Sequence, residues 1–231
     1  MVNIAGSTVL VVGANGAFGS EFSRQIIAQG GKVIGTAKDA ATSMRLAPDL
    51  HQRLLLNLED PNSITTLTTY LANAAENLDG IILASGLVAF GSIAETPFAV
   101  QQRLQQVNAI GQFQLISQLI PKLAAAATSE SSPFVVSISG VIAESPMAGL
   151  ASYSSSKTAL HGFAVAAAKE LKKLGIRWLD ARPGHTESGL ASRAIFGQAP
   201  NFGTGMDVTH VVSRIVRGIT DDEKDLPSTS F

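Results

Sequence analysis

The stretch TVLVVGANGAFGSEF, residues 8–22, decides the fold. It opens with five residues of apolar or β-branched type, a composition typical of a strand buried on both faces of a parallel sheet. Gly13, Gly16 and Gly19 follow, and a helical pattern of apolar residues begins at Phe18. Strand, glycine-rich turn and helix in this order indicate a dinucleotide-binding loop. The alternative is a glycine-rich turn that only packs.

Each glycine has a physical role in such a loop. Gly13 permits the tight turn, Gly16 removes a side chain where the cofactor approaches, and Gly19 allows close packing of helix on strand. The free N–H groups at the start of the helix can then bind pyrophosphate. The cofactor-binding residues expected in this loop are Gly13, Asn15, Gly16, Ala17, Phe18 and Gly19.

Strand and helix patterns alternate along the rest of the chain. Short apolar runs of the strand type lie at 7–13, 32–37, 52–58, 79–85, 133–139 and 176–181. Helical patterns lie at 17–29, 62–76 (with Asn62 as N-cap), 98–126 (interrupted by Gly111 and Pro121), 153–173 and 207–219. This alternation predicts an α/β fold, a doubly wound Rossmann-like parallel sheet flanked by helices in three layers. A polar tail is expected after residue 219.

Composition excludes several classes of function. The 231 residues suit one domain, expected over 1–231, and the net charge of −1 argues against nucleic acid bound mainly by electrostatics. The sequence contains no run of about 18 apolar residues, the length needed to span a membrane. There are no cysteines, and the four histidines lack metal-ligand spacing, so no metal site is expected. The N-terminal apolar run is too short for a signal peptide and lacks a basic leader, so we expect a cytoplasmic protein.

The end of the second strand, GTAKDAATSMR, bears on the choice of cofactor. In NAD sites an acidic residue there usually binds the ribose 2′-hydroxyl, but Ala37 occupies that place. Lys38 follows, and a cation beside small and hydroxyl residues suits a 2′-phosphate. Asp39 is a counter-signal, and Lys38 could be an ordinary surface lysine. The pattern favours NADP and leaves NAD possible.

Tyr153 and Lys157 are the candidates for chemistry. They lie four residues apart on a predicted helix and therefore share a face. A tyrosine, with a reference pKa of about 10, exchanges protons poorly near pH 7 until a nearby cation stabilises the phenolate. Lys157 can supply that cation. Y-x-x-x-K alone is a common accident, but after a dinucleotide loop and a fifth strand it indicates a catalytic pair.

With these motifs, the chain resembles a classical-type short-chain dehydrogenase/reductase over about residues 5–190. It is especially similar to bacterial reductases of the 3-ketoacyl-carrier-protein type in GKVIGTA and LLLNLEDPNSI. The resemblance implies a Rossmann-like sheet of seven strands and a homodimer or homotetramer through the helices at about 98–123 and 153–173. It also implies that the segment at about 189–206 covers the substrate.

The resemblance further implies site residues. Asn108, Tyr153 and Lys157 match the family's catalytic asparagine, tyrosine and lysine, although Asn108 could simply be a buried residue bonded to backbone. The family's Pro-Gly pair beside the nicotinamide falls on Pro183 and Gly184. Further expected cofactor contacts are Lys38, Asn57, Leu58, Ser85, Gly86, Tyr153, Lys157, Pro183, Gly184 and Thr186, with Ser188 at the family's hydroxyl position.

The chain departs from the family pattern at a catalytic position. Gly140 stands where the family has the serine that orients the substrate carbonyl, and Ala17 stands where it has the middle glycine of its turn. Ser139 either takes over as catalytic donor or the hydroxyl is missing. Strand alternation would point Ser139 away from where residue 140 points. Loss of one such donor typically slows a reaction by about 10²–10³.

Other polar residues near the expected site have ordinary explanations. We expect His161 to be a packing or interface residue. We expect Glu144 to be a solvated loop charge, although it could attract a cationic substrate. His185 follows the Pro-Gly pair and could contact the nicotinamide amide. Apolar residues expected near the mouth are Leu87, Val88, Phe90, Met147, Ile195, Phe196 and Phe202.

These observations predict an NADP-dependent oxidoreductase with Tyr153 as general acid/base and a small, largely apolar carbonyl or alcohol as substrate. The alternative is a cofactor-binding sensor or structural protein with little turnover, because Gly140 replaces the serine. A third possibility is a substrate whose own group replaces that hydroxyl.

Overall fold

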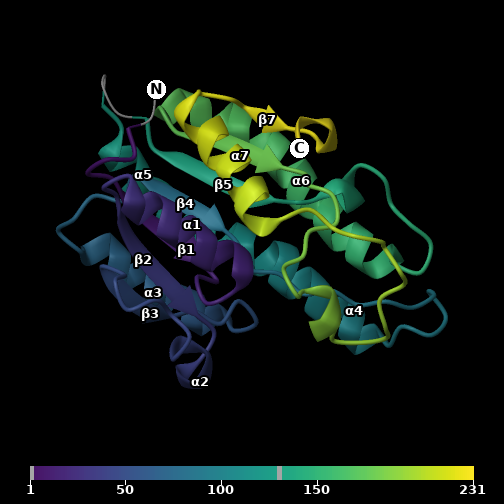
Figure 1. Cartoon of the computed structure of the whole chain (residues 1–231). Coiled ribbons are helices and arrows are strands. Elements are labelled where there is room, and N and C mark those ends of the chain that lie inside the picture. The colour runs from purple at the N-terminus through teal and green to yellow at the C-terminus, as the bar shows by residue number, and fades with distance from the viewer. Residues whose placement is uncertain (1–2, 129–131) are drawn as a thin grey trace.

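The computed structural model describes residues 3–128 and 132–231, so residues 1–2 and 129–131 of the expected domain lie outside the described part. Figure 1 shows one twisted sheet with helices on both faces. Its strands are β1 Thr8–Val12, β2 Lys32–Ala37, β3 Gln52–Leu55, β4 Gly80–Leu83, β5 Phe134–Ile138, β6 Arg177–Ala181 and β7 Asp225–Leu226. They are all parallel, in the order β3-β2-β1-β4-β5-β6-β7. This confirms the doubly wound Rossmann-like fold.

The helices divide between the two faces of the sheet. They are α1 Ala17–Ala28, α2 Ala40–Ser43, α3 Pro61–Asn73, α4 Phe98–Gln105, α5 Gly111–Ala126, α6 Ala151–Leu171 and α7 Val208–Thr220. Val9 and Val11 of β1 pack with α1 and α7, whereas Leu10 and Val12 pack with α3, α5 and α6. Because successive side chains of a strand point to opposite faces, both faces of β1 must be apolar.

One prediction at the end of an element was wrong. Helix α3 is capped by Asp60, whose side chain accepts from the Asn62 N–H at 2.9 Å, and not by Asn62 itself. Pro61 occupies the first helical position, where its missing N–H costs nothing. The polar tail contains β7, which pairs with β6 through Leu226 and completes the seven strands. A strand of two residues has no periodic pattern to recognise.

The helical region predicted at 98–126 is divided differently from the prediction. A π-helical turn, Gln106–Ile110, joins α4 to α5. Helix α5 continues through Pro121, which removes a single backbone bond without ending the helix. At its start, a Cβ on Gly111 would lie 2.5 Å from the Leu58 carbonyl oxygen, so the helix touches the backbone after β3. Turns of the π type are frequent at functional sites.

The segment at 189–206 lies against the loop after β4. The Phe90 N–H donates to the Phe196 carbonyl at 2.9 Å, and the Ile195 N–H donates to the Val88 carbonyl at 2.9 Å. The segment contains a short 3₁₀ turn, Ala191–Arg193. Across residues 3–128 and 132–231, no helix combines the length and the apolar character that a membrane crossing requires.

Candidate active site

A cavity of about 550 Å³ opens where the parallel strands end. Strands β1 and β4 are neighbours although β2 and β3 lie between them in sequence, and ligands of such sheets bind at this switch point. All of the expected cofactor-binding residues except Gly19 line the cavity. Of the expected catalytic residues, Tyr153, Lys157 and Ser139 line it.

The glycine turn is built as its sequence suggests. Gly13 has a φ of +80°, and a Cβ there would lie 2.5 Å from the Ser85 hydroxyl oxygen. A Cβ on Gly19 would lie 2.2 Å from the Gly13 carbonyl oxygen, so Gly19 is required for packing and not for lining the cavity. Gly16 is the N-cap of α1, and no side chain caps this helix. The turn therefore leaves room and uncapped N–H groups for a phosphate.

Three charged side chains line the cavity near the ends of β2 and β3. Glu59 binds Lys38 Nζ at 2.7 Å and binds Arg103 through two bonds of 3.0 Å each. Burial raises the pKa of Glu59, but hydrogen bonds from Arg103 and Lys38 outweigh burial and leave the pKa lowered. Sequence reasoning missed Glu59 and Arg103. Glu59 directly follows the expected contacts Asn57 and Leu58, whereas Arg103 is 44 residues away.

Tyr153 and Lys157 project into the cavity from the first turns of α6. Lys157 Nζ donates to the Ile138 carbonyl at the end of β5, at 2.8 Å. Burial lowers the Lys157 pKa to about 8, against the opposing attraction of Asp180. Burial raises the Tyr153 pKa to about 12. Both side chains therefore line one cavity in largely buried positions, and their roles as acid and cation stay a prediction.

Asn108 lies in the π-helical turn and is fully buried. Its Oδ1 accepts from the Leu87 N–H at 2.8 Å, and its Nδ2 donates to the Leu87 carbonyl at 2.9 Å and to the Ser156 hydroxyl at 3.0 Å. The side chain thus fastens the turn to the loop after β4 and to α6. Asn108 is not among the cavity-lining residues, so its catalytic role stays a prediction.

Ser139 and Gly140 have different surroundings just after β5. The Ser139 hydroxyl donates to Asp180 Oδ2 at 2.6 Å and is completely buried. Gly140 has a φ of +76°, and a Cβ there would meet only the Pro183 carbonyl oxygen, at 3.8 Å. Space is therefore available at residue 140, but an L side chain would be strained there. The donor role expected of Ser139 stays a prediction, and the geometry weighs against it because its one hydrogen is committed.

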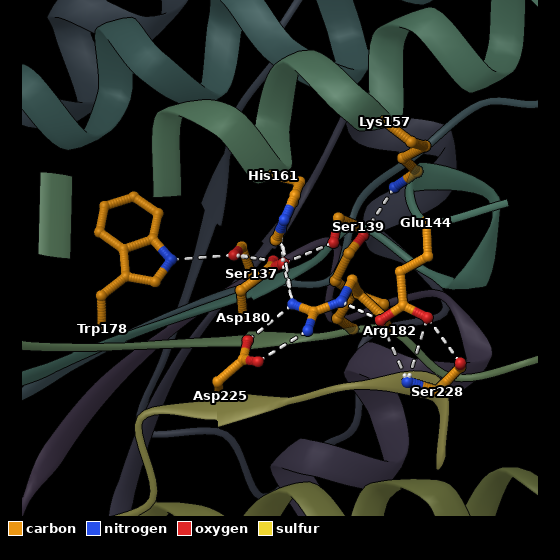
Figure 2. A network of polar contacts seen from close by, with 11 residues as sticks. Ser137, Ser139, Glu144, Lys157, His161, Trp178, Asp180, Arg182, Asp225 and Ser228 are labelled. Carbon is orange, nitrogen blue, oxygen red and sulfur yellow. Dashed lines mark hydrogen bonds and ion pairs between the residues drawn. The ribbon is translucent and has the colours of Figure 1, made fainter. Parts of the chain in front are cut away.

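Two neighbouring polar residues have specific partners that the sequence did not predict (Figure 2). Glu144 is exposed in the loop, as expected, but it also pairs with Arg182 and accepts from the Ser228 hydroxyl at 2.5 Å. His161 is more than a packing residue, because its Nδ1 lies 2.8 Å from Asp180 Oδ2. The partners come from β6 and the C-terminal segment, so no local pattern could reveal them.

The remaining wall of the cavity is largely apolar. Leu87, Val88, Phe90, Met147 and Phe202 line it as expected, and Leu150 and Leu190 are additions. His185 also lines it and lies against Phe202, with ring centroids 5.1 Å apart. Ile195 and Phe196, also expected near the mouth, do not line this cavity. Their backbone groups bond to the loop after β4.

Comparison with known proteins agrees with this geometry. A family model described as short chain dehydrogenase matches residues 7–195, and the chain belongs to this family of oxidoreductases. A curated relative, dehydrogenase/reductase SDR family member 7B of Danio rerio, is 21% identical over 243 residues, which cover 97% of this chain and 77% of the relative.

Solved structures share the fold at low sequence identity. A short chain dehydrogenase from Burkholderia cenocepacia J2315 in complex with NADP superposes with a TM-score of 0.84 at 16% identity, over 99% of this chain and 90% of the other. A 3-ketoacyl-(acyl-carrier-protein) reductase from Brucella melitensis complexed with NADH has a TM-score of 0.85 at 18% identity, over 97% of both chains.

Proposed function

We propose that the protein is an NADP-dependent oxidoreductase that interconverts a small, largely apolar carbonyl compound and its alcohol. The observation that carries the proposal is one cavity that contains Tyr153, Lys157 and the glycine turn. A nicotinamide cofactor fits these residues, because the turn offers uncapped N–H groups and Gly16 lines the cavity without a side chain. When bound, the cofactor supplies the hydride to the carbonyl carbon or accepts it from the alcohol.

The protein's own residues handle the proton. In reduction, Tyr153 donates its phenolic proton to the carbonyl oxygen as negative charge develops there. The Lys157 ammonium stabilises the resulting phenolate and is held in place by the Ile138 carbonyl. Pro183 and Gly184 form the wall on which a nicotinamide ring would lie. In oxidation, the Tyr153 phenolate takes the proton back from the alcohol.

Lys38 and Arg103 support the preference for NADP. Both line the same end of the cavity, near Ala37. A guanidinium and an ammonium together suit a 2′-phosphate. Glu59 forms ion pairs with both cations. A phosphate at this position would compete with Glu59 for them, so Glu59 sets how strongly NADP is favoured over NAD.

The test of the activity is the variant Tyr153→Phe with NADPH and a panel of small ketones and aldehydes. Loss of the acid should reduce kcat at least about 10²-fold, since general acid catalysis contributes that much or more. The affinity for NADPH should stay within about threefold of wild type, because binding energy comes mainly from other contacts. Full turnover in the variant would overturn the assignment of Tyr153.

A second candidate function follows from the Ser139–Gly140 pair. With the Ser139 hydroxyl bound to Asp180 and no side chain at Gly140, a cofactor-binding sensor with little turnover is the alternative. Tight NADPH binding without oxidation above background on the panel would favour the sensor. A substrate that supplies its own hydrogen bond in place of the serine would instead give turnover restricted to one chemical group.

Assembly and location are also proposals. Apolar side chains on α4, the π-helical turn and α6 remain exposed in one chain, among them Phe98, Ile110 and Val165. Their position supports a homodimer or homotetramer formed through these helices. We propose a cytoplasmic location on the sequence pattern alone.

A further inference from the structure

A buried carboxylate lies beside the end of β5, on the neighbouring strand β6 (Figure 2). Asp180 of β6 is 4% exposed and accepts from Ser137 at 2.5 Å and from Ser139 at 2.6 Å. Ser137 is the register partner of Asp180 across the β5–β6 pair. Residues 137 and 139 point to the same face of the strand, so both hydroxyls reach the one carboxylate.

The Lys157 side chain is hydrogen-bonded to the same end of β5. Its ammonium donates to the carbonyl of Ile138, the residue between the two serines that bind Asp180. One turn further along α6, His161 Nδ1 lies 2.8 Å from Asp180. Helix α6 is therefore fastened to the β5–β6 pair at two successive turns. The lysine of the proposed mechanism and the carboxylate of Asp180 are held in one rigid arrangement.

The charges around Asp180 do not balance without Lys157. Arg182 Nη1 lies 3.1 Å from Asp180, but the same guanidinium forms two bonds of 2.7 Å with Asp225 and a further bond with Glu144. One cation thus faces three carboxylates. The bonds of Arg182 to Asp225 are shorter than its single contact with Asp180. The inner carboxylate, Asp180, is left with excess negative charge toward the active site.

We propose that Asp180 is a positioning residue for the reaction, whose carboxylate balances the buried ammonium of Lys157 and keeps it charged beside Tyr153. The proposal rests on the proposed function for its catalytic meaning. It agrees with the electrostatics, because burial lowers the Lys157 pKa to about 8 and Asp180 opposes this decrease. Without Asp180, the lysine would lose its proton at a lower pH and could no longer stabilise a phenolate.

The other groups around Lys157 do not supply a negative charge. Burial raises the Tyr153 pKa to about 12, so the phenol is neutral near pH 7. The remaining polar or titratable groups that face Lys157 or Asp180 are the Ser137 and Ser139 hydroxyls of β5, the Asn108 amide of the π-helical turn, the Ser156 hydroxyl and His161 of α6, Arg182 of β6 and His185 on the cavity wall.

The experiment measures the titration of Lys157 by NMR in protein labelled with [13Cε]lysine. The resonance is assigned by its loss in Lys157→Arg. In wild type we expect a midpoint of about 8. In Asp180→Asn we expect the midpoint to fall by about 1 pH unit or more, since a nearby opposite charge has an effect of that size. The basic limb of the kcat profile for carbonyl reduction should move to lower pH by the same amount.

Asp225→Asn is the matched control. It also removes a carboxylate bound to Arg182, but Asp225 is half exposed and is not among the charges that shift the pKa of Lys157. We expect this variant to leave the Lys157 midpoint within about 0.3 pH unit, because solvent screens the charge. An equal shift in both variants would overturn the specific role of Asp180, as would an unchanged midpoint in a folded Asp180→Asn protein.

Folding and activity are kept separate in this test. Asp180→Asn leaves Arg182 with Asp225 and Glu144, so no buried cation loses all of its partners. If that variant does not fold, Asp180→Ser leaves room for water beside the two serines and should give the same shift. Failure of both to fold would assign Asp180 a structural role and overturn the proposal. The NMR titration needs no turnover, so it can succeed even where the proposed activity fails.

Discussion

Burial moves the proton equilibria of Tyr153 and Lys157 toward their neutral forms. The Tyr153 pKa is raised to about 12 and the Lys157 pKa is lowered to about 8. The pair therefore retains a phenolic proton near pH 7, which reduction requires, while the charge on the lysine depends on its neighbours. A residue outside the catalytic motif can change the reaction by changing that charge. Asp180 is placed to do so.

At the end of the cavity that contains Lys38, Glu59 and Arg103, single residues should determine the preference for NADP over NAD. Lys38→Ala should weaken NADPH binding about tenfold, because a charge-assisted bond to a phosphate is lost, and should leave NADH binding nearly unchanged. Glu59→Gln should have the opposite effect on NADPH, because it releases Lys38 and Arg103. Fluorescence titration with both cofactors measures the two ratios. Equal losses for NADPH and NADH in Lys38→Ala would contradict the assignment of this end to a 2′-phosphate.

Among the elements, the π-helical turn is the one that shapes the site. It holds Asn108 against Leu87 and brings α5 onto the backbone after β3. Gly111 makes this approach possible, since a Cβ would lie 2.5 Å from the Leu58 carbonyl oxygen. The end of β3 leads into Asn57 and Leu58, which line the cavity. Packing at Gly111 therefore positions Asn57 and Leu58 as well as the helix.

Gly111→Ala should destabilise the protein by about 1–3 kcal/mol, because the added methyl group forces backbone apart. Urea unfolding followed by circular dichroism measures the change. Gly162→Ala is the control, since a Cβ at this exposed position of α6 meets nothing within 4 Å. That substitution should stabilise by about 0.5–1 kcal/mol through helix propensity. Equal effects of the two changes would show that the contact with Leu58 is unimportant.

Across the whole molecule, the C-terminal segment is tied to the active-site loop. Glu144 follows β5 in the loop that contains Gly140, and Ser228 follows β7, 84 residues later. Arg182 lies between them and binds both Glu144 and Asp225. The last strand and the loop after β5 are thereby held together through buried charge.

Glu144→Gln should cost about 1–2 kcal/mol of unfolding free energy at pH 7, because hydrogen bonds from Arg182 and Ser228 to a carboxylate are weakened. Burial opposes these bonds, but the folded pKa of Glu144 remains below the ordinary value of 4.5. The stabilisation is therefore present above about pH 4.5 and is lost as the pH falls through the folded pKa. Urea unfolding at several pH values measures this difference.

Glu170→Gln, an exposed change on α6, is the control and should alter stability by less than about 0.5 kcal/mol at any of these pH values. A wild-type advantage over Glu144→Gln that did not shrink in acid would contradict an electrostatic role for Glu144.

The sequence by itself determined the first six strands, the glycine turn and the placement of Tyr153 and Lys157 on one helix. These features depend on local patterns, namely runs of apolar residues, glycine spacing and a single helical turn. Only the tertiary structure decided the partners of Glu59, Asp180 and Glu144, which lie 41 to 84 residues away for the bonds to Arg103, Ser139 and Ser228. The partner of a charged side chain leaves no repeating pattern in the sequence, because it depends on which strand ends the fold brings together. The hydrogen-bond partner of the Ser139 hydroxyl and the space around Gly140 also depend on the tertiary structure, because Asp180 and Pro183 lie in and just after the neighbouring strand β6.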